Sequence, residues 1–104
     1  MTETQFRVEL DEKDARVDAR FFGDLTIDAE EALNAAFRAA RLEGRPALVV
    51  DFAHVPYVNS AGIAALLGTL IHLRERTSSI RFVGLNRHLE KIFRMTGFPS
   101  LVSM

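Results

Sequence analysis

The sequence contains no cysteine, and this absence excludes disulfide bonds, thiolate catalysis and cysteine-ligated metal sites together. Its six glycines are scattered singly, so neither common type of glycine-rich phosphate-binding loop is present. No apolar run approaches the roughly 18 residues of a membrane span, and residues 1–5 lack the basic flank and apolar core of a secretory signal. We therefore expect a cytoplasmic protein that does not bind a membrane.

An excess of positive charge is also missing. The formal net charge is -1 and no long basic run occurs, which argues against a protein that binds nucleic acid, because such proteins neutralise phosphates along one face. The charge is nevertheless uneven. Residues 1–58 hold 12 acidic and 7 basic side chains, net -5, whereas residues 59–104 hold 2 and 6, net +4. This pattern permits a basic face toward an acidic partner, or mutual neutralisation of the two halves across one fold.

The length and composition fit one globular domain over residues 1–104. With 104 residues, of which 48% are hydrophobic, the chain can bury one sizeable core and is too short for two. No linker, repeat or low-complexity segment divides it. The oligomeric state is not indicated by any feature of the sequence.

Hydrophobic periodicity predicts a hairpin followed by a helix in the first part of the chain. Apolar residues alternate with polar ones on both sides of a charged turn, as expected of two antiparallel strands; they are Phe6, Val8 and Leu10, then Val17, Ala19 and Phe21. Asp28 and Glu31 form a capping pair for a helix with one apolar face. We expect this helix to end at Gly44.

The second part of the chain alternates between strands and helices. The nearly unbroken apolar run 47–52 predicts a central strand covered on both faces, and a loop with Pro56 leads to a helix that starts at Ser60. Residues 79–85 predict another strand, and Asn86 caps a third helix that stops at Gly97. Residues 101–102 can start a last short strand. The order predicts an α/β fold, a mixed sheet of four to five strands with three helices packed against it.

Signals for an enzyme are weak. Ser60 lies between a strand and a helix, as the serine of a nucleophile elbow does, but Val58 stands where that motif requires glycine. His54 is the only base nearby in the sequence, and no acid that could orient it is identifiable. His72 and His88 have no partner at metal-ligand spacing. We therefore predict no catalytic residue, no metal site and no cofactor.

The segment from Asp51 to Ile63, with the sequence DFAHVPYVNSAGI, resembles the signature of STAS domains. In that family a central strand ends in an acidic residue, crosses a short loop, and reaches an Asp-Ser-Ser/Thr-Gly-Leu-type turn that opens a helix. Residues 81–98 are similar to the family's third-helix ending, and the turn 23–25 fits as well. The resemblance thus covers nearly the whole chain and implies a STAS-like (SpoIIAA-like) fold.

The resemblance also implies a function in a bacterial partner switch. In such a switch the unmodified domain binds an anti-sigma factor that is also a serine kinase, and phosphorylation of the serine in the turn breaks the complex. That serine falls on Ser60 here. Near the first turn of a helix, free backbone N–H groups and the helix dipole favour an anion, and a phosphate adds about -1.5 to -2 charge. The family usually continues into a further helix beyond the position of Met104.

Two departures from the family pattern leave alternatives open. Asn59 replaces the aspartate before the serine, and Ala61 replaces a second hydroxyl. Asparagine still caps a helix well, but kinase recognition can depend on the missing carboxylate. Ser60 is then either the phosphorylated switch residue of an anti-sigma factor antagonist, or a structural cap. In the second case the domain is a constitutive adaptor or accessory subunit of a signalling or lipid-transport assembly.

The partner-binding surface implied by the resemblance comprises the loop before Ser60, the turn itself and the small-residue face of the following helix. Its members are Asp51, Val55, Tyr57, Val58, Asn59, Ser60, Ala61, Gly62 and Ala65. Exposed apolar side chains before the turn indicate an interface. Tyr57 and Val58 either form such an interface or fold inward.

Overall fold

The computed structural model describes residues 5–43 and 46–104, and within them four strands form one mixed sheet. The spatial order of the strands is β1-β2-β3-β4. β1 pairs antiparallel with β2, while β3 lies parallel to both β2 and β4. Their bounds are Arg7–Glu12 for β1, Arg16–Phe22 for β2, Ala47–His54 for β3 and Ser79–Val83 for β4. The predicted hairpin and the predicted mixed sheet are confirmed.

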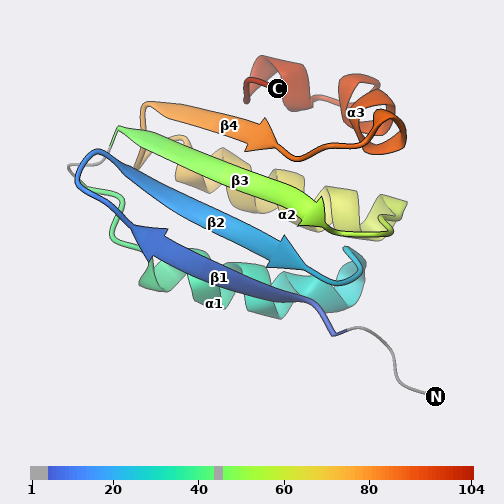
Figure 1. Cartoon of the computed structure of the whole chain (residues 1–104), viewed down its shortest axis with the longest axis horizontal. Helices are drawn as coiled ribbons and strands as arrows, with labels where there is room; N and C mark the ends of the chain where they lie inside the picture. The colour runs from blue at the N-terminus through green and yellow to red at the C-terminus, as the bar shows by residue number, and fades with distance from the viewer. Residues whose placement is uncertain (1–4, 44–45) are drawn as a thin grey trace.

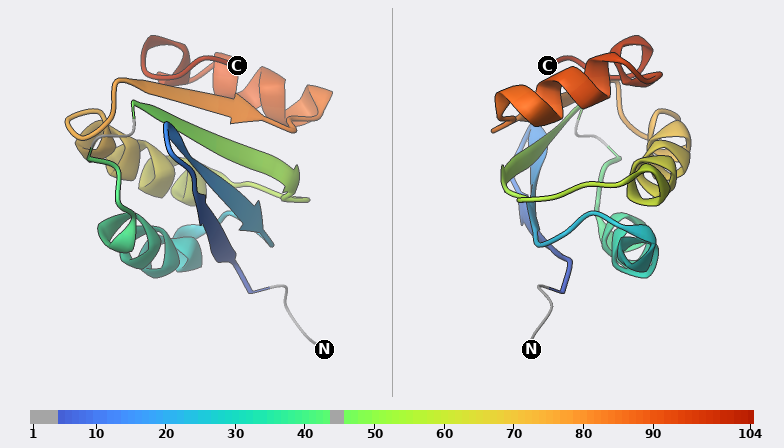
Figure 2. Two further views of the ribbon diagram at one scale, coloured as in Figure 1. Left: turned by 60° about the vertical axis from the view of Figure 1, so that its left-hand side comes forward. Right: turned by 90° about the vertical axis from the view of Figure 1, so that its right-hand side faces the viewer.

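Three helices accompany the sheet, which confirms the predicted α/β class. Two of them, α1 and α2, lie side by side on one face of the sheet, and α3 passes beyond the edge of β4 (Figures 1 and 2). Their bounds are Glu30–Ala39 for α1, Ser60–Leu73 for α2 and Arg87–Arg94 for α3, with two 3-10 turns, η1 at Ile27–Ala29 and η2 at Phe98–Ser100. The predicted fifth strand amounts to one parallel bridge between Arg81 and Ser103. No helix in the described ranges combines the length and the hydrophobicity needed to cross a bilayer.

The core contains a cluster of phenylalanine rings that come from the sheet, from α3 and from η2. Phe52 of β3 contacts Phe21 of β2, Phe82 of β4 and Phe93 of α3, with ring centroids 4.7 to 5.3 Å apart. Tilted and edge-to-face pairs of this kind add to the free energy of burial. Phe98 of η2 packs on Phe93 at 4.9 Å, so the segment after α3 is fixed to the same cluster.

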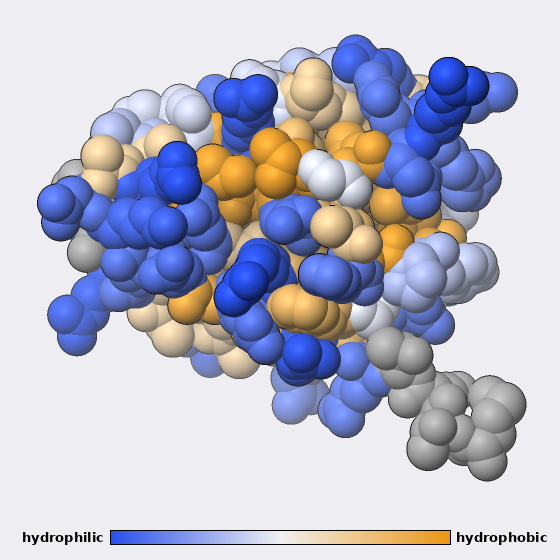
Figure 3. Space-filling model, viewed as in Figure 1, coloured by the Kyte–Doolittle hydropathy of each residue, from blue (hydrophilic) through white to orange (hydrophobic). Residues whose placement is uncertain are grey.

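The second face of the sheet is open, which corrects the prediction for the central strand. β3 does lie inside the sheet, but only its alternate residues Leu48, Val50 and Phe52 are buried, and the intervening side chains are half-buried. Val49 is flanked across the sheet by the polar residues Asp18 and Arg81. Figure 3 shows this face, with hydrophilic side chains over β1 and β2 and hydrophobic surface toward β3 and β4.

The start and end of α1 differ from the prediction. The hydroxyl of Thr26 accepts a hydrogen bond from the Asp28 amide and caps η1, and α1 follows without a side-chain cap, so the pair formed by Asp28 and Glu31 is not the cap. The helix ends at Ala39, and Gly44 lies outside the described residues.

Arg76 closes the C-terminal end of α1. Its guanidinium donates to the carbonyl oxygens of Phe37 and Ala40 at 2.8 and 2.7 Å, and to the carboxylate of Glu43 at 2.9 Å. These bonds satisfy carbonyls that a helix end leaves unpaired. The hydrogen bond from Arg76 is also the main cause that lowers the pKa of Glu43. The guanidinium of Arg76, which follows α2 in the chain, therefore stabilises the C-terminal end of α1.

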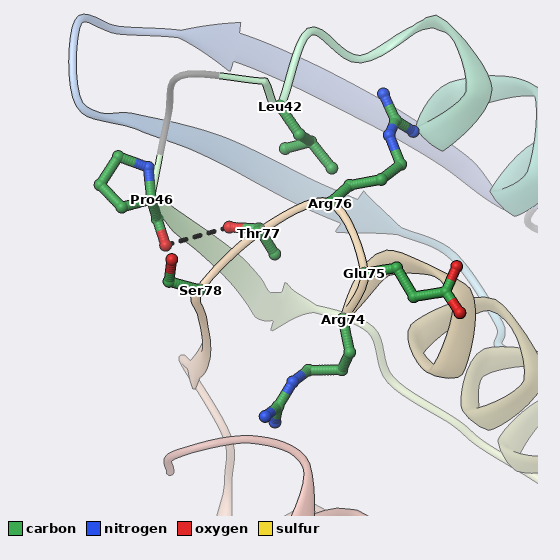
Figure 4. A pocket seen from close by; sticks show the side chains of 7 residues that line it. All are labelled: Leu42, Pro46, Arg74, Glu75, Arg76, Thr77 and Ser78. Atoms are coloured by element: carbon green, nitrogen blue, oxygen red, sulfur yellow. Dashed lines mark hydrogen bonds between the residues drawn. The ribbon is translucent and has the colours of Figure 1, made fainter.

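A cavity of about 470 Å³ lies beside this contact, at the end of the sheet where β3 and β4 begin. Figure 4 shows its lining, in which the Thr77 hydroxyl donates to the Pro46 carbonyl oxygen at 3.0 Å. Because β3 runs away from this end toward Ser60, the cavity is separated from the predicted switch residue by the length of the strand.

Candidate functional site

The approach to Ser60 is held by backbone pairing between two loops. After β3 ends at His54, residues 55–59 run beside residues 23–25, which follow β2. The Leu25 amide donates to the Tyr57 carbonyl oxygen at 2.9 Å, and the Asn59 amide donates to the Leu25 carbonyl oxygen at 3.1 Å. A parallel bridge joins Leu25 to Val58. The sheet pattern thus continues past the strands and fixes the position at which α2 begins.

Ser60 is the first residue of α2, and its side chain is exposed. Asn59 is the N-cap, and its Oδ1 accepts a hydrogen bond from the Gly62 amide at 2.9 Å. Within the described ranges the hydroxyl of Ser60 makes no hydrogen bond, and the amides of Ser60 and Ala61 donate to no acceptor. The turn therefore presents a free hydroxyl next to two free N–H groups at the positive end of a helix dipole.

The first turn of α2 lies directly on the backbone of residues 25 and 26. A Cβ atom built on Gly62 would stand 1.9 Å from the Leu25 carbonyl oxygen and 2.7 Å from the Thr26 amide nitrogen. No side chain fits at that distance. Glycine at position 62 of the turn motif is therefore required by internal packing.

Four of the predicted partner-binding residues lie at least partly on the surface of this turn. Tyr57 is 53% exposed, Ser60 and Ala61 are exposed, and Asn59 is half-buried. Sequence reasoning missed one neighbour, Ile27, which lies in η1 against the start of α2 and is 55% exposed. Two large apolar side chains thus lie exposed on the segments that adjoin α2, as at the centre of protein interfaces.

Four other predicted members are buried, and this corrects the expected surface. Val55 and Val58 are 3% and 8% exposed, because the pairing with residues 23–25 turns both side chains into the core. Gly62 and Ala65 face the interior of the molecule. The half-buried Asp51 accepts a hydrogen bond from the Ala53 amide at 2.9 Å, so its carboxylate orders the end of β3.

The small-residue face of α2 differs from the prediction in one member, since Ala65 is buried. Ala61, Ala64 and Gly68 are exposed in place of Ala65, and Ile71 continues the same side at 54% exposure. α2 contains no Asp, Glu, Lys or Arg. The surface next to Ser60 therefore extends along an uncharged helix.

The histidine nearest Ser60 in the sequence is engaged elsewhere. The ring of His54 stacks on Phe22 at 4.9 Å, and the guanidinium of Arg7 lies 4.1 Å from the centre of the same phenyl ring. In residues 5–43 and 46–104 no three His, Asp or Glu side chains gather in a way that could hold a metal ion.

Replacing the cap tests the local structure of the turn. Asn59→Ala removes the bond to the Gly62 amide and is expected to lower the free energy of unfolding by about 1 kcal/mol. Asn59→Asp is the matched control, because a carboxylate caps equally well and favours the helix N-terminus, so its stability is expected to stay within about 0.5 kcal/mol of native. Urea denaturation followed by circular dichroism measures both. Equal losses in the two variants would show that the cap bond does not stabilise α2.

Comparisons with known proteins agree with this geometry. A family model described as "Mlab, STAS domain" matches residues 7–103. The anti-sigma-B factor antagonist of Listeria monocytogenes is 24% identical over 98 residues, covering 93% of this chain and 86% of that protein.

Solved structures share the fold. An anti-sigma factor antagonist from Mycobacterium paratuberculosis superposes with a TM-score of 0.71 at 20% identity, covering 93% of this chain and 82% of that one. The anti-sigma factor antagonist SpoIIAA in its unphosphorylated form gives 0.60 at 20% identity, with 88% and 83% coverage. The phosphorylated form of SpoIIAA, a Bacillus cell fate determinant, gives 0.59 at 17% identity, with 91% and 87% coverage.

Proposed function

The chain belongs to the STAS domain family, and on that premise we propose that it is an anti-sigma factor antagonist, a non-enzymatic regulatory domain switched by phosphorylation of Ser60. The relative from Listeria carries that name, and SpoIIAA has been solved in both phosphorylation states. The observation that carries the proposal is the exposed, unbonded hydroxyl of Ser60 at the first position of α2.

The unmodified turn suits a protein partner. Tyr57 and Ile27 offer exposed apolar surface, and the uncharged face of α2 continues it, so that a partner can cover this region without removing a charge from water. The proposed partner is an anti-sigma factor with serine kinase activity, which would use Ser60 both as a contact and as a substrate.

Phosphorylation at this position would separate the partner without unfolding the domain. A phosphate adds about -1.5 to -2 charge, and the free amides of Ser60 and Ala61 can stabilise it. Burying the same charge against a partner costs several kcal/mol unless a cation pairs with it. The modified turn is therefore compatible with the fold and incompatible with an apolar interface.

A phosphorylation assay tests the proposal. Each serine-kinase anti-sigma factor of the source organism is purified and incubated with this protein and ATP, and the peptide that spans residues 51–68 is analysed by mass spectrometry. We expect phosphoserine at position 60 and no product in Ser60→Ala. Phosphate on another hydroxyl, or no transfer from any of these kinases, would refute the switch at Ser60.

A further inference from the structure

The helix α3 presents a basic surface that the proposed function does not use. Its exposed side chains include Arg87, His88, Lys91 and Arg94. Arg94 pairs with Glu90 at 2.9 Å. Among the described residues no carboxylate lies within ion-pair distance of Arg87 or Lys91. The face of α3 thus carries positive charge that the fold does not neutralise.

This surface lies at the same end of the molecule as Ser60. Viewed from that end, α3, the segment that leads from β3 into α2, and the segment that leads from β2 into η1 follow one another across the molecule (Figure 2, right). Negative charge lies along this last segment and the elements after it, with Asp24 before η1, Asp28 within η1 and Glu30 at the start of α1. The Ser60 turn is therefore flanked by positive charge on one side and by negative charge on the other.

We propose that the basic face of α3, centred on Arg87 and Lys91, is a second contact surface that binds an acidic segment of the partner that docks at Ser60. The proposal rests on the proposed function, because it concerns the same partner. Charge complementarity carries the argument. Opposite charges on the two flanks favour one orientation of a partner that covers the turn, and they accelerate its approach.

An anionic lipid surface fits this helix less well than an acidic protein segment does. A helix that lies in a membrane interface needs a free apolar face. The apolar side chains of α3 are committed to the core, since Leu89 and Phe93 are 1% and 0% exposed. Met95, 77% exposed at the end of the helix, is the only large apolar side chain that α3 and its C-cap leave free in the described structure.

Binding kinetics with the anti-sigma factor that binds at Ser60 provide the test. The double variant Arg87→Glu/Lys91→Glu is expected to lower the association rate constant about 10-fold at low salt, with little change in dissociation, and to flatten its dependence on ionic strength. Arg38→Glu is the control for the reversal of one exposed positive charge, since Arg38 is also exposed, on α1 and toward the opposite end of the molecule. We expect native kinetics for the control. An unchanged association rate in the double variant would overturn the inference.

A second measurement locates the surface without the partner. A peptide of ten glutamates, titrated into isotopically labelled protein, is expected to shift the amide signals of residues 87–95 in the native protein and not in the double variant. Shifts confined to other basic residues would count against the basic face of α3, as would binding of the native protein to phosphatidylglycerol vesicles through α3.

If Ser60→Asp blocks the partner while the double variant binds normally, the inference about α3 fails and the proposed function stands. If no anti-sigma factor binds, both proposals fail.

Discussion

Ser60→Asp is expected to weaken binding of the anti-sigma factor at least about 100-fold, whereas Ser60→Ala keeps the affinity within about threefold of native. The aspartate places a fixed negative charge at the first position of α2, a helix without Asp, Glu, Lys or Arg, in the region where Tyr57 and Ile27 are exposed. Desolvation of an unpaired charge in an interface costs several kcal/mol, and each 1.4 kcal/mol corresponds to a factor of about ten in affinity.

The same substitution is expected to leave the domain folded. Negative charge at the first turn of a helix interacts favourably with the dipole, and the Ser60 side chain makes no hydrogen bond in the described ranges that would be lost. We therefore expect the free energy of unfolding of Ser60→Asp to equal the native value or to exceed it by about 0.5 kcal/mol. Urea denaturation measures stability, and biolayer interferometry with the purified anti-sigma factor measures affinity.

Ser79→Asp is the control for charge alone. Ser79 is also exposed, but it begins β4 at the opposite end of the sheet, beyond the reach of a partner seated on the Ser60 turn. We expect this variant to bind normally. Equal affinities for Ser60→Asp and Ser60→Ala would show that Ser60 is not a switch residue, and would favour a constitutive adaptor.

The elements predicted correctly from the sequence are those whose signals are local. Alternation of apolar residues located the hairpin, and Asn59 and Asn86 were both identified as caps, since each accepts from an amide three residues ahead, at 2.9 and 2.8 Å. Such bonds depend on neighbours along the chain. The position of Ser60 at the start of α2 follows from the same local pattern.

The predictions that are wrong concern residues whose surroundings are set by segments far away in the sequence. Val55 and Val58 looked like loop residues, yet pairing with residues 23–25 extends the sheet and buries them. The 3-10 turn at η1 moves the start of α1, and Ala64 rather than Ala65 is exposed on α2 because the face of that helix is set by packing against its neighbours. Periodicity gives the face of a helix only to within about one residue. The closure of α1 by Arg76 joins residues more than 30 positions apart, and no local signal predicts it.

The two glycines of α2 are expected to respond in opposite directions to alanine. Gly62→Ala should lower the free energy of unfolding by about 3 kcal/mol, because its Cβ would lie 1.9 Å from the Leu25 carbonyl oxygen, and a backbone atom cannot rotate away as a side chain does. Gly68→Ala should raise it by about 1 kcal/mol, because alanine is the better helix former and no atom lies within 4 Å of the added Cβ.

Urea denaturation of both variants tests this contrast, and the double variant Gly62→Ala/Gly68→Ala keeps the measurement possible if Gly62→Ala alone is too unstable. In the double variant the gain at position 68 offsets part of the loss at position 62, since the two sites lie nearly two helical turns apart and their effects add. The Gly62 contact also sets where Ser60 stands, so Gly62→Ala should displace the turn and shift the amide signals of residues 25–27 and 57–61. If Gly62→Ala were as stable as Gly68→Ala, the close approach of α2 to residues 25 and 26 would be wrong, and with it the placement of the Ser60 hydroxyl.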